Sequence, residues 1–237
     1  MMNLLGETTS TVIAGVLLIA VPIAFNAAFA ALAAKFDYPN ILRKPTAEVL
    51  AKFSAGGSSL VLLWWGFAMT AALLTPLAIL VSVSLEGAAP AILFAAAAVG
   101  VVASVVQFLG LIRWPFLVPY LARESQEPET TPARREAIDI VFQSFNRYLG
   151  VAVGEHLGFL FTGTWTALTG VAILQSSNVN GWVGVAGIII GITLALCSLE
   201  FVGPFETKGW KPAAVATPFV YIVWSLWLIL TGIALLL

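Results

Sequence analysis

Six apolar stretches, each long enough to cross a bilayer as a helix, alternate with polar segments along the chain. A membrane-spanning helix needs about 20 mostly apolar residues, because the hydrocarbon core is about 30 Å thick and each residue adds about 1.5 Å. The stretches that meet this requirement are Thr11–Ala34, Ser58–Leu85, Ala88–Ile112, Leu149–Leu174, Gly181–Val202 and Ala213–Leu237. The pattern therefore predicts an all-α integral membrane protein, a six-helix bundle that forms one transmembrane domain over residues 1–237.

The basic residues fall only on alternate polar segments. All 11 Lys and Arg residues lie within residues 35–57, 113–148 and 203–212, and the N-terminal tail, the other two connections and the C-terminus carry none. Positive charge close to spanning helices marks the cytoplasmic side. We therefore expect these three loops to be cytoplasmic and both termini to be non-cytoplasmic, in a multi-pass protein of the plasma membrane.

Two of the polar loops contain amphipathic segments. Pro45–Phe53 places Val49, Leu50 and Phe53 on one helical face, which predicts a short helix lying on the membrane. A second helix is expected after Pro132, and it could continue directly into the fourth apolar stretch. Aromatic residues near the predicted interfaces are expected to form a membrane-interface belt. They are Trp114, Tyr120, Tyr148, Trp182 and Trp210.

Composition agrees with a membrane protein and excludes several functional classes. The chain is 60% hydrophobic and only 10% charged, whereas soluble domains are about 25% charged. Its net charge of −1 gives no basic field for nucleic acid. The single cysteine, Cys197, excludes an intramolecular disulfide, and His156 is the only histidine, so one chain cannot ligate haem through two histidines. We predict no metal site and assign no catalytic residue and no cofactor.

Five polar side chains interrupt the apolar stretches, all in the half nearest the basic loops. This polar layer consists of Asn26, Gln107, Glu155, His156 and Glu200. Ionisable residues within spans are rare and are candidates for function. The layer could bind a ligand head group or relay protons, whereas the structural alternative is that Glu155 and His156 join helices through hydrogen bonds.

The fourth stretch also carries a polar stripe. At 100° per residue, Thr162, Thr166 and Thr169 fall within about 40° of Glu155. Small-residue faces for close helix packing are expected in the fourth and fifth stretches, with a lipid or cofactor groove as the alternative. These faces consist of Gly150, Gly154, Gly158, Gly184, Gly187 and Gly191.

Three segments resemble a known bacterial family: FDYPNILRKPTAEVLAKFSAGG, VGEHLGFLFTGTWTAL and the final YIVWSLWLILTGIALLL. The family is the one catalogued as domain of unknown function 4386, and the resemblance covers nearly the whole chain. It implies a multi-span bacterial membrane protein and supplies no reaction. The positions that it marks as family-motif residues are Glu155, His156, Gly158, Thr162, Gly163 and Trp165.

The leading hypothesis is a non-enzymatic membrane protein that binds a hydrophobic ligand, a lipid or a membrane partner through the polar layer. A small proton-coupled transporter or permease is the second hypothesis, based on the polar stripe. An intramembrane lipid-modifying enzyme with Glu155 or His156 as general acid or base is the third. The expected partners are the bilayer and a hydrophobic small molecule or a membrane protein, with no nucleic acid, and the oligomeric state stays open.

Overall fold

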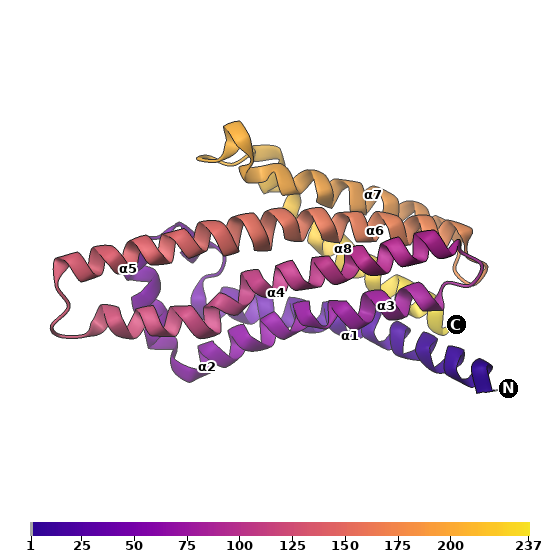
Figure 1. Ribbon diagram of the computed structural model, residues 1–237, viewed down its shortest axis with the longest axis horizontal. Coiled ribbons are helices and arrows are strands. Elements are labelled where there is room, and N and C mark those ends of the chain that lie inside the picture. Colours follow the sequence, from indigo (N-terminus) through magenta and orange to yellow (C-terminus); the bar gives the residue numbers. More distant parts are fainter. Residues whose placement is uncertain (1) are drawn as a thin grey trace.

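The computed structural model describes residues 2–237, with side chains from residue 9 onward, as an all-helical bundle (Figure 1). Six of its helical segments are long and apolar enough to cross a membrane, as predicted. These are Thr9–Phe36, Thr46–Ser84, Pro90–Gln126, Pro132–Gln175, Gly181–Phe201 and Lys211–Leu236. No strand occurs in the part of the chain that the structure describes. A helix satisfies its own backbone hydrogen bonds, which is why apolar segments adopt it in lipid.

The spans are built from eight α-helices and a π-helix, joined by short 3₁₀ turns. The α-helices are α1 (Met2–Phe36), α2 (Thr46–Ala72), α3 (Leu74–Ser84), α4 (Pro90–Gln126), α5 (Pro132–Phe145), α6 (Gly158–Gln175), α7 (Gly181–Cys197) and α8 (Lys211–Leu236). The π-helix η2 (Asn146–Leu157) joins α5 to α6, and the 3₁₀ turns are η1 (Asn40–Arg43), η3 (Ser198–Phe201) and η4 (Gly203–Phe205).

Both chain ends lie at the same end of the bundle (Figure 1). The turn from α3 to α4 and the turn from α6 to α7 lie there too, and hydrogen bonds join them. Gln175 Oε1 accepts from the Ala89 N–H at 3.0 Å, and Asn178 Nδ2 donates to the Ser84 carbonyl at 2.8 Å. The α4–α5 turn lies at the opposite end of the bundle (Figure 1). An ion pair between Arg147 and Glu206 joins η2 to the α7–α8 connection.

Much of the segment predicted as a loop over residues 113–148 is helical. Helix α4 continues through Pro115 and Pro119 to Gln126, and α5 runs directly into η2 and α6. The sequence prediction ended the third span at Ile112, because Arg113 interrupts the apolar run. The helix nevertheless continues, because Trp114, Val118 and Leu121 are buried against neighbouring helices and no longer need lipid around them.

The segment Pro45–Phe53 does not lie on the membrane surface as a separate helix. Its helical part is the first part of α2, and the helix is kinked at Gly57, whose φ of 56° favours glycine. Val49, Leu50 and Phe53 face the protein interior and are at most 2% exposed. The apolar face that suggested lipid contact is therefore covered by other helices.

A buried aromatic cluster joins α1, α2 and α4. The rings of Trp64 and Trp114 stack with centroids 4.4 Å apart and an interplanar angle of 9°. Phe36 meets both rings edge-on, at 6.1 Å and 5.5 Å, and Phe53 stacks on Trp114 at 6.0 Å. Trp114 is thus a core residue, and its predicted place in an interface belt is wrong.

Helices α6 and α7 pack with backbone against backbone. A Cβ atom on Gly163 would lie 2.4 Å from the Gly191 carbonyl oxygen, and one on Gly170 would lie 2.6 Å from that of Gly184. Gly187 lies against the Trp227 ring, where an added Cβ would approach to 2.7 Å. Side chains larger than hydrogen would separate these helices.

Candidate functional site

The polar residues of the fourth span lie on a π-helix. Its 12 residues, Asn146–Leu157, include both Glu155 and His156. A π-helix bonds residue i to i+5, so it has a wider turn than an α-helix and changes the direction of its side chains; such insertions are frequent at functional sites. Glu155 therefore does not keep the 100° register with Thr162 that the sequence prediction assumed.

Glycines bring this π-helix into contact with α4. A Cβ atom on Gly154 would lie 3.1 Å from the Gly110 Cα, and one on Gly158 would lie 3.1 Å from Gln107 Cγ. A Cβ on Gly150 would lie only 2.6 Å from an Arg113 guanidinium nitrogen. The glycines on this face of η2 therefore allow α4 and the Arg113 side chain to approach the π-helix closely.

Arg113 lies in α4 beside this face, and the sequence reasoning had placed it in a loop. Its Nη2 donates to Asn146 Oδ1 at 3.0 Å, and its Nη1 donates to the Gly110 carbonyl. The positive charge of Arg113 acts favourably on Glu155, but the two side chains form no ion pair. The sequence does contain a signal that Arg113 lies within a helix. It is the apolar segment WPFLVPYL directly after Arg113, which indicates that the span continues.

Glu155 is half-buried, and none of the described residues donates a hydrogen bond to its carboxylate. Among charged groups, Arg113 attracts the Glu155 carboxylate and Glu200 repels it. Glu155 is thus a carboxylate within an apolar segment long enough to span a membrane, with an unused capacity to accept hydrogen bonds.

Tyr38 comes from the connection between α1 and α2, directly before the cis bond to Pro39. Its ring meets Trp64 edge-on at 5.1 Å and Phe29 at 5.4 Å. Burial raises the pKa of the Tyr38 phenol to about 12, with a further increase from the Glu155 charge and a decrease from Arg113. Tyr38 therefore stays neutral at physiological pH, with its hydroxyl able to donate.

Tyr221 lies in α8, and its ring contacts two phenylalanines. Its ring is stacked with that of Phe25 at 6.2 Å and meets Phe159 at 5.3 Å. Phe25 contacts Phe67 at 4.9 Å, and Phe67 contacts Tyr38 at 6.4 Å. We call this continuous set of rings, in which phenylalanines link Tyr38 to Tyr221, the aromatic arc. Its members are Tyr38, Phe29, Phe67, Phe25, Tyr221 and Phe159.

His156 and Glu200 have contacts of their own at the start of the α7–α8 connection. The His156 Nδ1 lies 2.8 Å from the Ser198 carbonyl oxygen, at the start of η3. The Glu200 carbonyl accepts from the Trp210 N–H at 2.7 Å, and the Glu200 side chain is half-buried. No hydrogen bond links the Glu155, His156 and Glu200 side chains in the described part of the chain.

The amides and threonines of the predicted site form hydrogen bonds between and within helices. Gln107 Nε2 donates to Thr162 Oγ1 at 2.6 Å, and Trp224 Nε1 donates to Thr166 Oγ1 at 2.9 Å. Asn26 Nδ2 donates to the Pro22 carbonyl at 2.7 Å and to Ser225 Oγ at 2.9 Å. These hydrogen bonds join α4 to α6, α8 to α6 and α1 to α8.

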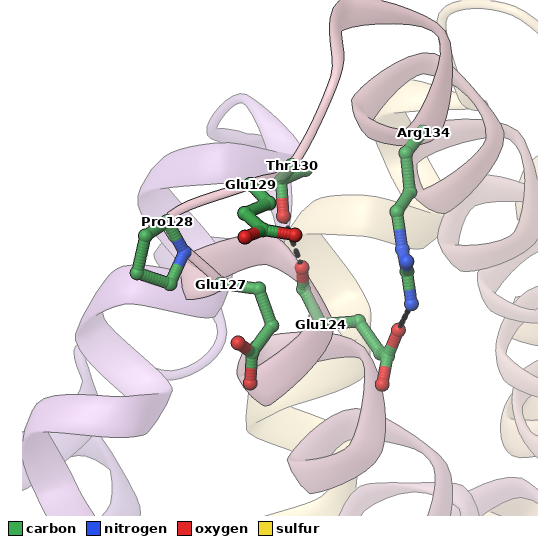
Figure 2. Close-up of a pocket in the computed structure, with 6 residues that line it drawn as sticks. All are labelled: Glu124, Glu127, Pro128, Glu129, Thr130 and Arg134. Carbon is green, nitrogen blue, oxygen red and sulfur yellow. Dashed lines mark hydrogen bonds and ion pairs between the residues drawn. The ribbon is translucent and has the colours of Figure 1, made fainter.

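A hollow of about 360 Å³ lies at the turn between α4 and α5 (Figure 2). It is lined by Glu124, Glu127, Pro128, Glu129, Thr130 and Arg134, and Figure 2 shows Arg134 paired with Glu124 across it. The hollow is open to solvent and has a single cation, already paired, among three carboxylates. Among the described residues, no three His, Cys, Asp or Glu side chains form a group that could hold a metal ion.

Comparison with known families identifies the group to which the chain is related. Residues 13–232 match the family described as Domain of unknown function (DUF4386). The chain belongs to this family. No curated protein and no solved structure matches the chain. The DUF4386 match agrees with a multi-span membrane protein, which the six apolar helices also show.

The residues of the fourth span that carry the resemblance to DUF4386 differ from one another in their surroundings. Gly158 and Gly163 lie against neighbouring helices, Thr162 accepts from Gln107, and Trp165 is fully buried. The Glu155 carboxylate has no hydrogen-bond donor among the described residues, and the Trp165 Nε1 has no acceptor. Of these two motif residues, Trp165 is fully buried, whereas Glu155 keeps part of its surface accessible.

Proposed function

We propose that this DUF4386 protein binds a hydrophobic ligand within the membrane and holds the ligand's polar head at Glu155. The ligand would lie between η2 and the aromatic arc, with Arg113 and the two tyrosines around its head. The observation that supports the proposal is the half-buried Glu155 carboxylate with no hydrogen bond. Polar groups placed away from water without a partner are costly, by about 1–3 kcal/mol and more for a charged group.

A purely structural role fits Glu155 less well than its neighbours. Asn26, Gln107 and His156 each form a hydrogen bond to another helix or turn, as a residue that joins helices should. Glu155 has no such partner, although Arg113 lies close enough to act on it. A carboxylate without a partner in the protein is free to accept a hydrogen bond from a ligand.

Replacing Glu155 with glutamine should lower the amount of ligand that stays with the purified protein about tenfold or more. The amide keeps the shape of the side chain and removes the charge, and a hydrogen bond to a charged group contributes about 1.5–3 kcal/mol. Mass spectrometry of an organic extract, normalised to protein, measures the retained ligand. Glu129→Gln, in the α4–α5 turn, is the matched control.

The proposal would be wrong if Glu155→Gln and wild-type protein retained the same compounds in equal amounts. Melting temperature in detergent should be measured on all three proteins. A ligand loss that merely followed a lower melting temperature would favour a structural role of Glu155.

We also propose that the protein lies in the bacterial plasma membrane with both termini non-cytoplasmic. The distribution of basic residues supports this orientation, because residues 35–57, 113–148 and 203–212 carry all 11 of them. We expect alkaline phosphatase fused after Leu237 to be active and a green fluorescent protein fused there to be dark. Fusions truncated after Glu129 should give the opposite pattern. The same pattern at both positions would contradict the orientation.

A further inference from the structure

We propose that Arg113 binds the phosphate group of a phospholipid, in the bilayer leaflet at the end of the bundle opposite the two termini (Figure 1). This lipid site is separate from the one proposed at Glu155, and it does not depend on that function. Three features of Arg113 carry the inference: donors with no carboxylate to bind, a position on an exposed apolar stripe, and a depth that matches the lipid headgroups. Arginine pairs with phosphate through two parallel hydrogen bonds, which suits it to such a headgroup.

The Arg113 guanidinium is held in place and still has donors to spare. Its Nη1 donates to the Gly110 carbonyl, its Nη2 donates to Asn146 Oδ1 at 3.0 Å, and its Cζ lies 5.3 Å from the centre of the Trp114 ring. None of the ion pairs that the described residues form includes Arg113. A guanidinium has more N–H donors than these two acceptors use, and it stays charged at physiological pH. Its other donors and its charge are therefore available to an anion.

Arg113 belongs to a stripe of exposed apolar side chains along α4. Leu109, Arg113, Phe116 and Tyr120 follow one another at helical spacing and so share one face of the helix. Leu109 is 42% exposed, Phe116 69% and Tyr120 51%, and Arg113 keeps part of its surface accessible. Val118, on the other side of this segment, is only 1% exposed. A lipid that lies along the exposed stripe therefore meets Arg113.

Helix length places Arg113 at the level of lipid headgroups. The α3–α4 turn carries the exposed residue Glu86, whose charge keeps the turn outside the hydrocarbon core, and α4 begins soon after it at Pro90. Arg113 lies about 35 Å further along the helix, at about 1.5 Å per residue. The hydrocarbon core is about 30 Å thick, and the headgroup regions extend the bilayer to about 40–45 Å. Arg113 thus reaches the headgroup layer of the far leaflet, with Leu109 on the acyl-chain side of it.

Native mass spectrometry of the full chain in detergent micelles tests the inference. The probe is dioleoyl-phosphatidylglycerol, and dioleoylglycerol is the comparison with the same acyl chains and no phosphate. We expect the phospholipid to bind saturably and dioleoylglycerol not to do so. Arg113→Gln should weaken phospholipid binding about tenfold, the loss expected for a charged hydrogen-bonding partner. The matched control Arg123→Gln changes an exposed arginine about 15 Å further along α4, beyond the headgroup layer, and should bind as wild type.

Two further variants separate lipid binding from the hydrogen bond that joins α4 to η2. Asn146→Ala removes this hydrogen bond and leaves the guanidinium, so it should keep the phospholipid. Arg113→Lys keeps the charge and should bind the phospholipid more tightly than Arg113→Gln does. If Arg113→Gln fails to fold, wild-type protein is labelled with a photoactivatable phosphatidylglycerol instead. The label should then be found on the segment of α4 from Leu109 to Tyr120, and label found only elsewhere would contradict the site.

Several results would overturn the inference. They are equal binding of dioleoylglycerol, no saturable phospholipid binding to the wild-type chain, unchanged binding in Arg113→Gln, and an equal loss in Asn146→Ala and Arg113→Gln. Displacement of the phospholipid by millimolar inorganic phosphate would show a site for free phosphate instead of a lipid site.

Glu155→Gln distinguishes this inference from the proposed function. It should leave phosphatidylglycerol binding unchanged, because Arg113 holds the phosphate. Loss of the phospholipid in Glu155→Gln would show one shared site and would contradict a separate lipid site at Arg113. Failure of phospholipid binding in Arg113→Gln and wild type alike would leave the ligand retention expected at Glu155 untouched.

Discussion

Replacing Trp114 with alanine should lower the free energy of unfolding by about 3–5 kcal/mol, the range found for large aromatic residues in tightly packed cores. The Trp114 ring is stacked with Trp64, meets Phe36 and Phe142 edge-on and is only 1% exposed. Its removal would leave a cavity at the junction of α1, α2, α4 and α5, which rigid helices cannot close. Unfolding of the purified protein in mixed micelles with increasing dodecyl sulfate measures the change.

Trp65→Ala is the matched control for this prediction. Trp65 is the neighbour of Trp64 in the same helix, but it is 48% exposed. Its removal leaves no internal cavity, and we expect a change within about 0.5 kcal/mol. Equal effects of the two substitutions would show that the cluster does not stabilise the bundle more than a lipid-facing tryptophan does.

Gly191→Ala should destabilise the protein by about 3 kcal/mol, at the upper end of the range for overpacking. The added Cβ would lie 2.5 Å from both the Ala167 N and the Gly163 carbonyl oxygen. These are backbone atoms of α6, so no change of side-chain rotamer can make room and the two helices must move apart. The same dodecyl sulfate titration measures the loss.

Gly66→Ala separates this packing effect from the general effect of glycine in a helix. Gly66 lies within α2, and a Cβ there would meet nothing within 4 Å. Alanine is the better helix former, so this change should be neutral or stabilising by up to about 1 kcal/mol. A stabilising effect of Gly191→Ala would mean that α6 and α7 do not pack as closely as described.

The six spans could be predicted because apolar length alone determines whether a segment can cross a bilayer. The ends of the spans could not be predicted in the same way. Hydropathy stops the third span at Arg113, but Trp114 and Val118 continue it by packing on α2 and α5, and this depends on long-range contacts. The kink at Gly57 was also missed, because glycine is compatible with both a continuous and a bent helix.

The site was predicted in part. Glu155 could be chosen from sequence because a carboxylate within an apolar stretch is rare. Its grouping with His156 rested on their similar depth along the span, and no hydrogen bond joins the two side chains: His156 Nδ1 contacts the Ser198 carbonyl instead. Arg113 and Tyr38 were assigned to loops, so the contacts of Arg113 with Asn146 and of Tyr38 with Trp64 could not be anticipated from local pattern.

The length of α4 has a geometrical consequence. Its 37 residues extend about 55 Å, some 25 Å more than the hydrocarbon core of a bilayer. The α4–α5 hairpin is therefore longer than a bilayer crossing requires, and its turn lies at the far end of the bundle from the two termini (Figure 1). The Glu124–Arg134 pair and the Thr131 cap of α5 close this turn. Since α5, η2 and α6 are continuous over Pro132–Gln175, the tip of this hairpin and the turn that carries Glu155 belong to one unbroken helical segment.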